Sequence, residues 1–151
     1  DQEAKKLGGL LARESMAVCT GGYKGIMEAV SLGAKEAGGK AIGITTAQFP
    51  GKVNAGVTEE ESMPTWDERL FRLIEKGDAY VVFGGGTGTL VELFVVWEMA
   101  NKNMHTKPVI LIGDLPKKLF QEFKSEKFVK YNERLQSAAS AEEVLKILTD
   151  K

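Results

Sequence analysis

The chain has 151 residues, of which 43% are apolar and 27% charged, and its 20 basic and 21 acidic side chains leave a net charge of −1. This length suits one domain that buries roughly 70% of the surface its unfolded chain would expose. The balanced charge argues against a protein that binds nucleic acid through bulk charge. The single cysteine excludes an internal disulfide and a cysteine-based zinc site, and the single histidine excludes a histidine-rich metal site. No apolar run approaches the ~20 residues of a membrane span, and no signal peptide is evident, so we expect a cytoplasmic protein that does not bind membranes.

Short apolar runs alternate with helical patterns along the chain. The apolar runs predict buried strands at residues 16–20, 41–45, 79–83 and 109–112, and an edge strand at 134–138. Helical spacing of apolar residues predicts helices at residues 2–13, 25–37, 65–76, 89–101, 115–130 and after Ser140. Thr65 and Ser140 are each followed three residues later by a glutamate, which is typical of a capping box at a helix start. Residues 46–61 are predicted to form a long polar loop, a type of segment that is often functional.

This alternation predicts an α/β fold of the Rossmann-like type, with an open, doubly wound and mainly parallel sheet covered by helices on both faces. A barrel is less suitable because it typically needs ~250 residues. We expect residues 1–151 to form a single Rossmann-like nucleotide-binding domain. Such folds usually open on a strand, whereas this sequence opens on a helix, so we expect the first strand to be absent from this chain.

Two glycine-rich loops follow predicted strands, at the sheet edge where ligands bind in such folds. The first reads Gly21-Gly22-Tyr23-Lys24-Gly25, and the second, residues 84–88, reads Gly-Gly-Gly-Thr-Gly. Glycine lets the backbone approach an anion, and the N–H groups of the following helix then point at it. For the first loop, a tight turn is an equally good explanation of the glycines. In the second loop, four glycines in five residues exceed what a turn requires. We therefore predict a phosphate cradle.

Two known phosphate-binding patterns are absent from the loops, and their absence narrows the type of phosphate ligand. Neither loop contains the Gly-Lys-Ser/Thr ending of a P-loop, and the dinucleotide pattern that starts at Gly84 has Thr89 at its last glycine position. ATP hydrolysis and ordinary NAD chemistry are therefore disfavoured. A mononucleotide or a sugar phosphate remains.

The helix after the second loop carries Glu92 about one turn from its start. Thr89 and Glu92 have the spacing of a capping box, so Glu92 is explained equally well as a structural cap or as a catalytic carboxylate. Arg69, on the preceding helix, offers a cation for such a site. Because the helix at 89–101 is apolar on nearly every side, it needs cover on nearly every side. A second subunit would provide it, and so would close packing within a monomer; we favour a homodimer.

These residues together resemble the LONELY GUY-type family of cytokinin riboside monophosphate phosphoribohydrolases, often labelled lysine decarboxylases. Residues 84–92 match the family signature P-G-G-x-G-T-x-x-E at every fixed position except the first, where Gly84 replaces proline. Arg69 lies nine residues before Asp78-Ala79, where the family has its catalytic arginine. Residues 21–27 are similar to the family's first glycine loop, G-G-x-x-G-L-M.

The resemblance implies a Rossmann-like homodimer that binds a nucleoside 5′-monophosphate and cleaves its N-glycosidic bond, releasing free base and ribose 5-phosphate. It assigns catalysis to Arg69 and Glu92, with no metal and no organic cofactor. The substrate-binding residues that it implies, together with the two loops, are Gly21, Gly22, Gly25, Met27, Gly85, Gly86, Thr87, Gly88 and Thr89. A pyridoxal-phosphate lysine decarboxylase is not supported, because the short chain has no corresponding lysine site.

The sequence departs from the family pattern at several positions. Val91 replaces the first of two paired glutamates, Leu70 replaces a lysine after the arginine, and Glu28 replaces a glycine. The same superfamily contains molybdenum-cofactor carriers and the DNA-processing DprA type. The alternative is therefore a protein that binds a nucleotide or a pterin-type cofactor and catalyses nothing.

Three further side chains have simpler interpretations. Cys19 falls in a buried strand and is predicted to pack as a small hydrophobe. His105 lies in a polar turn and is predicted to be solvated. Trp97 is suited to base stacking, but core packing is the commoner role of a tryptophan.

Overall fold

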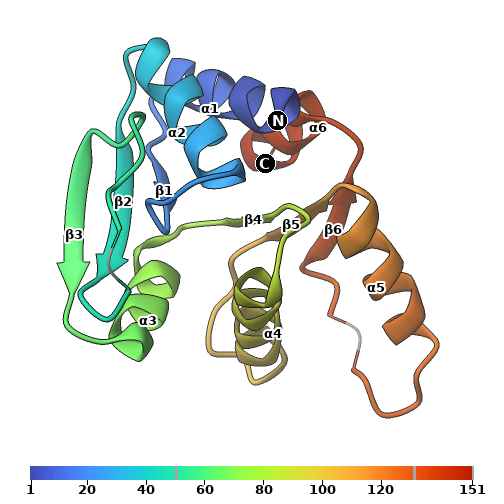
Figure 1. Cartoon of the computed structure of the whole chain (residues 1–151). Coiled ribbons are helices and arrows are strands. Elements are labelled where there is room, and N and C mark those ends of the chain that lie inside the picture. Colours follow the sequence, from blue (N-terminus) through green and yellow to red (C-terminus); the bar gives the residue numbers. More distant parts are fainter. Residues whose placement is uncertain (50, 131, 151) are drawn as a thin grey trace. The chain divides into compact units, whose positions relative to one another are not determined.

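The computed structural model describes residues 1–49, 51–130 and 132–150, and it consists of two compact units, Asp1–Gly77 and Asp78–Lys151 (Figure 1). Each unit contains a three-stranded parallel sheet with helices packed against it. The predicted Rossmann-like α/β class, with parallel strands and helices on both faces, is confirmed.

The first unit has the sheet order β1-β2-β3. Strand β2 is central, with Val18 of β1 opposite its Ala41 and Glu59 of β3 opposite its Ile42. All six residues of β2 are buried, and helices α2 and α3 both contact it, so both faces of this strand are covered. In chain order the elements are α1 (Gln2–Arg13), β1 (Val18–Thr20), α2 (Ile26–Glu36), β2 (Ala41–Thr46), β3 (Glu59–Met63) and α3 (Trp66–Lys76).

Helices α1 and α2 pack closely because glycines stand where they cross. A Cβ atom on Gly8 would fall on the carbonyl oxygen of Val30 and lie 2.9 Å from the backbone nitrogen of Ala34. A Cβ atom on Gly33 would likewise fall on the carbonyl oxygen of Lys5. The neighbouring Gly9 has ordinary space, with 3.6 Å to the nearest atom. The two backbones are therefore in direct contact at Gly8 and Gly33.

The second unit has the sheet order β4-β5-β6. All four residues of the central strand β5 are buried, and its Val109 lies opposite Tyr80 on one side and Leu135 on the other. In chain order the elements are β4 (Tyr80–Val82), α4 (Thr87–Asn101), β5 (Val109–Ile112), α5 (Asp114–Lys124), β6 (Leu135–Ala138) and α6 (Ala141–Thr149). Aromatic rings join α4 to α5: Phe94, Trp97, Phe120 and Phe123 have centroids 5.8 to 6.2 Å apart.

The prediction that residues 46–61 form only loop is wrong, because strand β3 begins at Glu59. Its sequence, Glu-Glu-Glu-Ser-Met, has no apolar alternation, and three of its five residues are exposed. Main-chain pairing to β2 holds the strand, supported by a 2.7 Å hydrogen bond from the Thr45 hydroxyl to Glu60 and a 3.3 Å ion pair between Lys40 and Glu59. A polar edge strand of this kind leaves no hydrophobic pattern to detect.

Two helix boundaries also differ from the prediction. Helix α4 begins at Thr87 with Gly86 as its N-cap, two residues early, so Thr89 lies inside the first turn and the Thr89–Glu92 capping box is wrong. The helix predicted to reach residue 130 ends at Lys124. The other two capping residues are correct, because the hydroxyls of Thr65 and Ser140 accept hydrogen bonds from the backbone N–H groups three residues on.

The tryptophan and histidine of the second unit are engaged in packing. Trp97 is 6% exposed and donates its indole N–H to the carbonyl of Lys130 at 3.1 Å. His105, predicted to be solvated, is half-buried. Its Nε2 lies 2.8 Å from the Val96 carbonyl, and its Nδ1 accepts a hydrogen bond from the N–H of Lys107. Within the described parts of the chain, no helix has both the length and the apolar character needed to cross a bilayer.

The close crossing of α1 and α2 makes a testable prediction about two adjacent glycines. In Gly8→Ala the new methyl group meets backbone atoms that cannot move alone, so we expect a loss of about 1–3 kcal/mol of unfolding free energy. Gly9→Ala is the matched control, because its methyl group has room and alanine favours a helix by up to ~1 kcal/mol. Urea unfolding of both variants measures the difference; equal stability would contradict the backbone contact.

Candidate functional site

The first glycine loop runs from the end of β1 to the start of α2. Gly22 and Gly25 have φ angles of 82° and 78°, a region that favours glycine. Gly25 is the N-cap of α2 and supplies no side chain to bond the first N–H groups of this helix. The loop is therefore shaped by its glycines, and it leaves the N-terminus of α2 without a side-chain cap.

Arg69 of α3 reaches the start of this loop and the neighbouring strand β2. Its Nε donates to the carbonyl of Ile44 at 2.8 Å, and its Nη2 donates to the carbonyl of Gly21 at 3.0 Å. Its guanidinium carbon lies 5.2 Å from the centroid of the Tyr23 ring, in cation–π contact. The guanidinium of the half-buried Arg69 is thus fixed by two main-chain carbonyls and by one aromatic ring.

Gly21 is required by this arrangement for reasons of space. A Cβ atom there would fall on Nη2 of Arg69 and would lie 2.9 Å from Sδ of Met27. Gly21 itself is buried. The missing side chain leaves the volume that the guanidinium and the Met27 thioether occupy.

The connection from β2 to β3, residues 47–49 and 51–58, is named the strap here. Asn54, only 6% exposed, fastens it to the glycine loop: its backbone N–H donates to Gly22 at 2.9 Å and its side-chain amide donates to the Tyr23 carbonyl at 2.6 Å. The Tyr23 hydroxyl donates to the carbonyl of Phe49 at 3.2 Å. Gln48 accepts a 2.6 Å hydrogen bond from the N–H of Trp66, the first residue of α3. The strap therefore lies against both the glycine loop and the start of the helix that carries Arg69.

Helix α3 is anchored on β3 by ion pairs around Glu61. Lys76 Nζ lies 2.7 Å and Arg72 Nε 3.0 Å from the two carboxylate oxygens. Hydrogen bonds from Lys76 and then Arg72 lower the pKa of Glu61 below its ordinary value. Burial raises the pKa of the nearby Cys19 thiol to about 11, which favours the protonated thiol near neutral pH.

The second glycine loop lies in the other unit, between β4 and α4. Gly85, Gly86, Thr87 and Gly88 are exposed, and Thr89 is half-buried. No side chain caps α4 at Gly86, and no acidic residue lies in its first turn. Gly113, the N-cap of α5, also lacks a side-chain cap, and a Cβ atom on it would lie 3.9 Å from the backbone nitrogen of Gly84. The glycine loops before α4 and α5 therefore run side by side, with the N–H groups of α4 accessible to an anion.

The structure assembles the predicted site residues in two groups. In the first unit, Gly21 and Met27 lie next to the Arg69 guanidinium, and Gly22 and Gly25 belong to the same loop as Gly21. Residues 85–89 form the second loop, and Glu92, half-buried, follows in the second turn of α4. Tyr23 and Asn54 were not predicted; the only sequence signals are that Tyr23 lies inside the glycine loop and that Asn54 precedes Gly56 in a polar loop.

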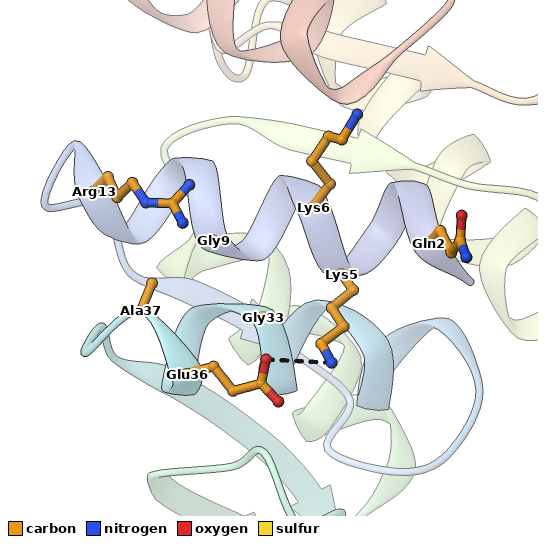
Figure 2. A pocket seen from close by; sticks show the side chains of 8 residues that line it. All are labelled: Gln2, Lys5, Lys6, Gly9, Arg13, Gly33, Glu36 and Ala37. Carbon is orange, nitrogen blue, oxygen red and sulfur yellow. Dashed lines mark ion pairs between the residues drawn. The ribbon is translucent and has the colours of Figure 1, made fainter.

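A surface pocket of about 360 Å³ lies between α1 and α2, away from these predicted residues (Figure 2). Lys5 and Glu36 form a 3.2 Å ion pair across it, and Gly9 and Gly33 leave its floor without side chains. The remaining lining residues are Gln2, Lys6, Arg13 and Ala37. Among the residues that the structure describes, no group of three or more His, Cys, Asp or Glu side chains is placed to hold a metal ion.

Parallel strands followed by glycine loops and uncapped helices define a protein of the Rossmann-like α/β class. Residues 1–144 match the SLOG cluster4 family, and the chain belongs to this family.

Two sequence relatives carry the name cytokinin riboside 5′-monophosphate phosphoribohydrolase. The protein from Rhodococcoides fascians is 30% identical over 117 residues, which is 75% of this chain and 59% of that protein. The protein from Arabidopsis thaliana is 35% identical over 106 residues, which is 69% of this chain and 46% of that protein. The chain thus spans about half the length of these relatives.

Solved structures of molybdenum cofactor proteins are also similar. The molybdenum cofactor binding protein from Rippkaea orientalis is 32% identical, with a TM-score of 0.74 over 97% of this chain and 83% of that chain. A Moco carrier protein from Chlamydomonas reinhardtii, 24% identical with a TM-score of 0.75, shares the fold over 97% of this chain and 83% of that chain. Together the matches confirm the predicted resemblance at the level of the superfamily.

The ion pairs of Glu61 predict how stability depends on pH. Because the pKa of Glu61 is lower in the folded state, its contribution is fully present above the pKa of the unfolded chain, about 4.3. The contribution is lost as the pH falls through the lower folded-state value. We expect Tm to fall less steeply on acidification in Glu61→Gln than in the wild type. Glu75→Gln is the control, since Glu75 also pairs with Arg72 but its side chain is 75% exposed; identical Tm profiles for wild type and Glu61→Gln would contradict the prediction.

The space at Gly21 supports a second prediction. Gly21→Ala displaces the Arg69 guanidinium and breaks its bonds to two carbonyls, so we expect a loss of about 1–3 kcal/mol in unfolding free energy. Gly51→Ala is the control, because its new methyl group would make ordinary contact, 3.6 Å, with the Tyr23 ring. Chemical denaturation compares the two, and a neutral Gly21→Ala would show that the guanidinium does not need this volume.

Proposed function

We propose that this protein is a nucleoside 5′-monophosphate phosphoribohydrolase, which cleaves the N-glycosidic bond to give free base and ribose 5-phosphate. The observation that carries the proposal is Arg69, held by the carbonyls of Gly21 in the first glycine loop and of Ile44 in β2, in a chain 30–35% identical to relatives of that name. The retained signature residues 85–89 and Glu92 support it further.

The chemistry assigns distinct roles to the residues. In the reaction, water adds its oxygen to C1′ of the ribose while the bond to the base nitrogen breaks, and the base leaves with a proton. Positive charge develops on the ribose as this bond breaks, and the Glu92 carboxylate is suited to stabilise it, to orient the ribose hydroxyls or to activate the water. The backbone N–H groups of the glycine loops are suited to hold the phosphate.

Arg69 is suited to bind the anionic nucleotide or to balance charge on the departing base. Its Nε and Nη2 are already committed to main-chain carbonyls, and within the described chain its Nη1 makes no hydrogen bond to protein. The guanidinium therefore presents one amino group to a ligand from a fixed position, which lowers the cost of ordering it on binding.

A second candidate function is non-catalytic binding of a nucleotide or a pterin-type cofactor. It is favoured by the likeness to the Rippkaea orientalis protein, which extends over 97% of this chain at 32% identity. Val91 and Leu70, where the hydrolase pattern has glutamate and lysine, point the same way. The two functions differ in their need for Glu92 as a reacting carboxylate.

We also propose that the working form is a homodimer. Phe94 of α4 supports this, because its ring is 41% exposed although it stacks on Trp97 and meets Phe123 edge to face. An aromatic side chain left open on an otherwise apolar helix is suited to contact a second subunit.

Product analysis tests the catalytic proposal. The purified protein is incubated with AMP and a panel of other nucleoside monophosphates, and free base and ribose 5-phosphate are quantified by chromatography. We expect both products in equal amounts, and a rate at least about 100-fold lower in Glu92→Gln, because the variant lacks a charged carboxylate.

Glu98→Gln is the matched control, since Glu98 is an exposed glutamate on the same helix, and its rate should equal that of the parent. A Glu92→Gln variant as active as the parent would overturn the role of this carboxylate. If no nucleotide yields product but one of them, or a pterin, raises Tm, the binding function replaces the catalytic one.

A further inference from the structure

Tyr23 stands at a position that the family's glycine-loop pattern, G-G-x-x-G-L-M, leaves variable. Its ring nevertheless contacts the one arginine that the resemblance places in the reaction. The guanidinium carbon of Arg69 is 5.2 Å from the ring centroid, while Nε and Nη2 bond to Ile44 and Gly21. The two hydrogen bonds fix one edge of the guanidinium, and the ring supports its face.

The other side of Tyr23 is tied to the strap. Its hydroxyl donates to the carbonyl of Phe49 at 3.2 Å and accepts from the N–H of Thr46 at 3.4 Å. Its own carbonyl accepts from the Asn54 amide at 2.6 Å. A Cβ atom on Gly51 would lie 3.6 Å from the ring. Tyr23 is therefore held at its hydroxyl and at its main-chain carbonyl, and the strap supplies a partner at both points.

We propose that Tyr23 is a positioning residue for Arg69: its ring holds the guanidinium so that Nη1 faces the ligand, and its hydroxyl links that orientation to the strap. The proposal deepens the proposed function, because it names a residue that acts through Arg69 on the same site. The ring contributes by stacking, which phenylalanine reproduces and leucine does not. The hydroxyl contributes only through the strap.

The first test observes Arg69 directly and needs no enzymatic activity. The Nε proton of Arg69 is followed by nitrogen-15 NMR in the full chain, and its signal is assigned by its absence in Arg69→Lys. Because this proton is hydrogen-bonded to the carbonyl oxygen of Ile44, we expect it to exchange slowly with water. In Tyr23→Leu we expect exchange to be about fivefold faster or more, and in Tyr23→Phe within about twofold of the parent. Phe71→Leu, which removes an exposed ring from the same helix, is the control and should exchange as the parent does.

Unchanged exchange in Tyr23→Leu would overturn the proposal. So would a Tyr23→Phe variant as disturbed as Tyr23→Leu, because the hydroxyl and not the ring would then hold the arginine. Tm of each variant is measured alongside, and the proposal stands only if Tyr23→Phe, folded like the parent, retains the slow exchange.

The second test applies to catalysis. With a nucleotide that the parent hydrolyses, we expect Tyr23→Leu to lower kcat/KM about fivefold or more, and Tyr23→Leu in an Arg69→Lys background to have no further effect. Additive losses would show that Tyr23 acts independently of Arg69 and would overturn the proposal. If the parent hydrolyses no nucleotide, the proposed function fails, whereas the exchange experiment still decides the role of Tyr23.

Discussion

The first unit is organised around one hydrogen-bonding requirement: two main-chain carbonyls, that of Gly21 directly after β1 and that of Ile44 within β2, need donors. Gly21 and Gly22 have no side chain that could donate, so the donor comes from another element. Arg69 meets both with a single guanidinium. A buried carbonyl left without a donor costs about 1–3 kcal/mol. The empty volume at Gly21, the ring of Tyr23 and the anchoring of α3 through Glu61 all serve the placement of that one cation.

Under the proposed function, Arg69 has a structural role and a ligand-binding role. Its Nε and Nη2 bond to main-chain carbonyls, and its Nη1 is the group proposed to contact the ligand. Removing the Arg69 side chain therefore removes the hydrogen bonds to the two carbonyls together with the proposed ligand contact. A loss of activity alone would not show which of the two was responsible. Tyr23 is more informative because it touches the guanidinium without bonding to either carbonyl. An enzyme and a carrier both benefit from a cation fixed before the ligand arrives, so the geometry at Arg69 suits either function, while Glu92 distinguishes them.

The sequence alone predicts the strands and helices that have an apolar pattern, and it predicts both glycine loops and Arg69. It misses β3 because three consecutive glutamates carry no burial signal, and main-chain pairing to β2 is invisible without the partner strand. It assigns Thr89 to a helix cap because the spacing to Glu92 fits, whereas the helix starts at Thr87 on an uncapped glycine. Tyr23 and Asn54 escape for another reason: their roles depend on contacts with residues 26 and 31 positions away, which no local pattern encodes. Local motifs can therefore be predicted from the sequence, whereas contacts between residues far apart in the chain cannot.

The helices fall into two kinds at their N-termini. Helices α1, α3 and α6 are closed by the side chains of Asp1, Thr65 and Ser140, whereas α2, α4 and α5 begin at glycines that close nothing. A glycine N-cap gives a few tenths of a kcal/mol less stability than a serine or aspartate N-cap. The helices that follow β1, β4 and β5 are therefore slightly less stable at their N-termini. Mutagenesis guided only by thermostability would fill these glycines with capping residues. Each such substitution would place a side-chain oxygen beside the N–H groups proposed to hold a phosphate, so under that proposal a gain in stability would come with weaker ligand binding.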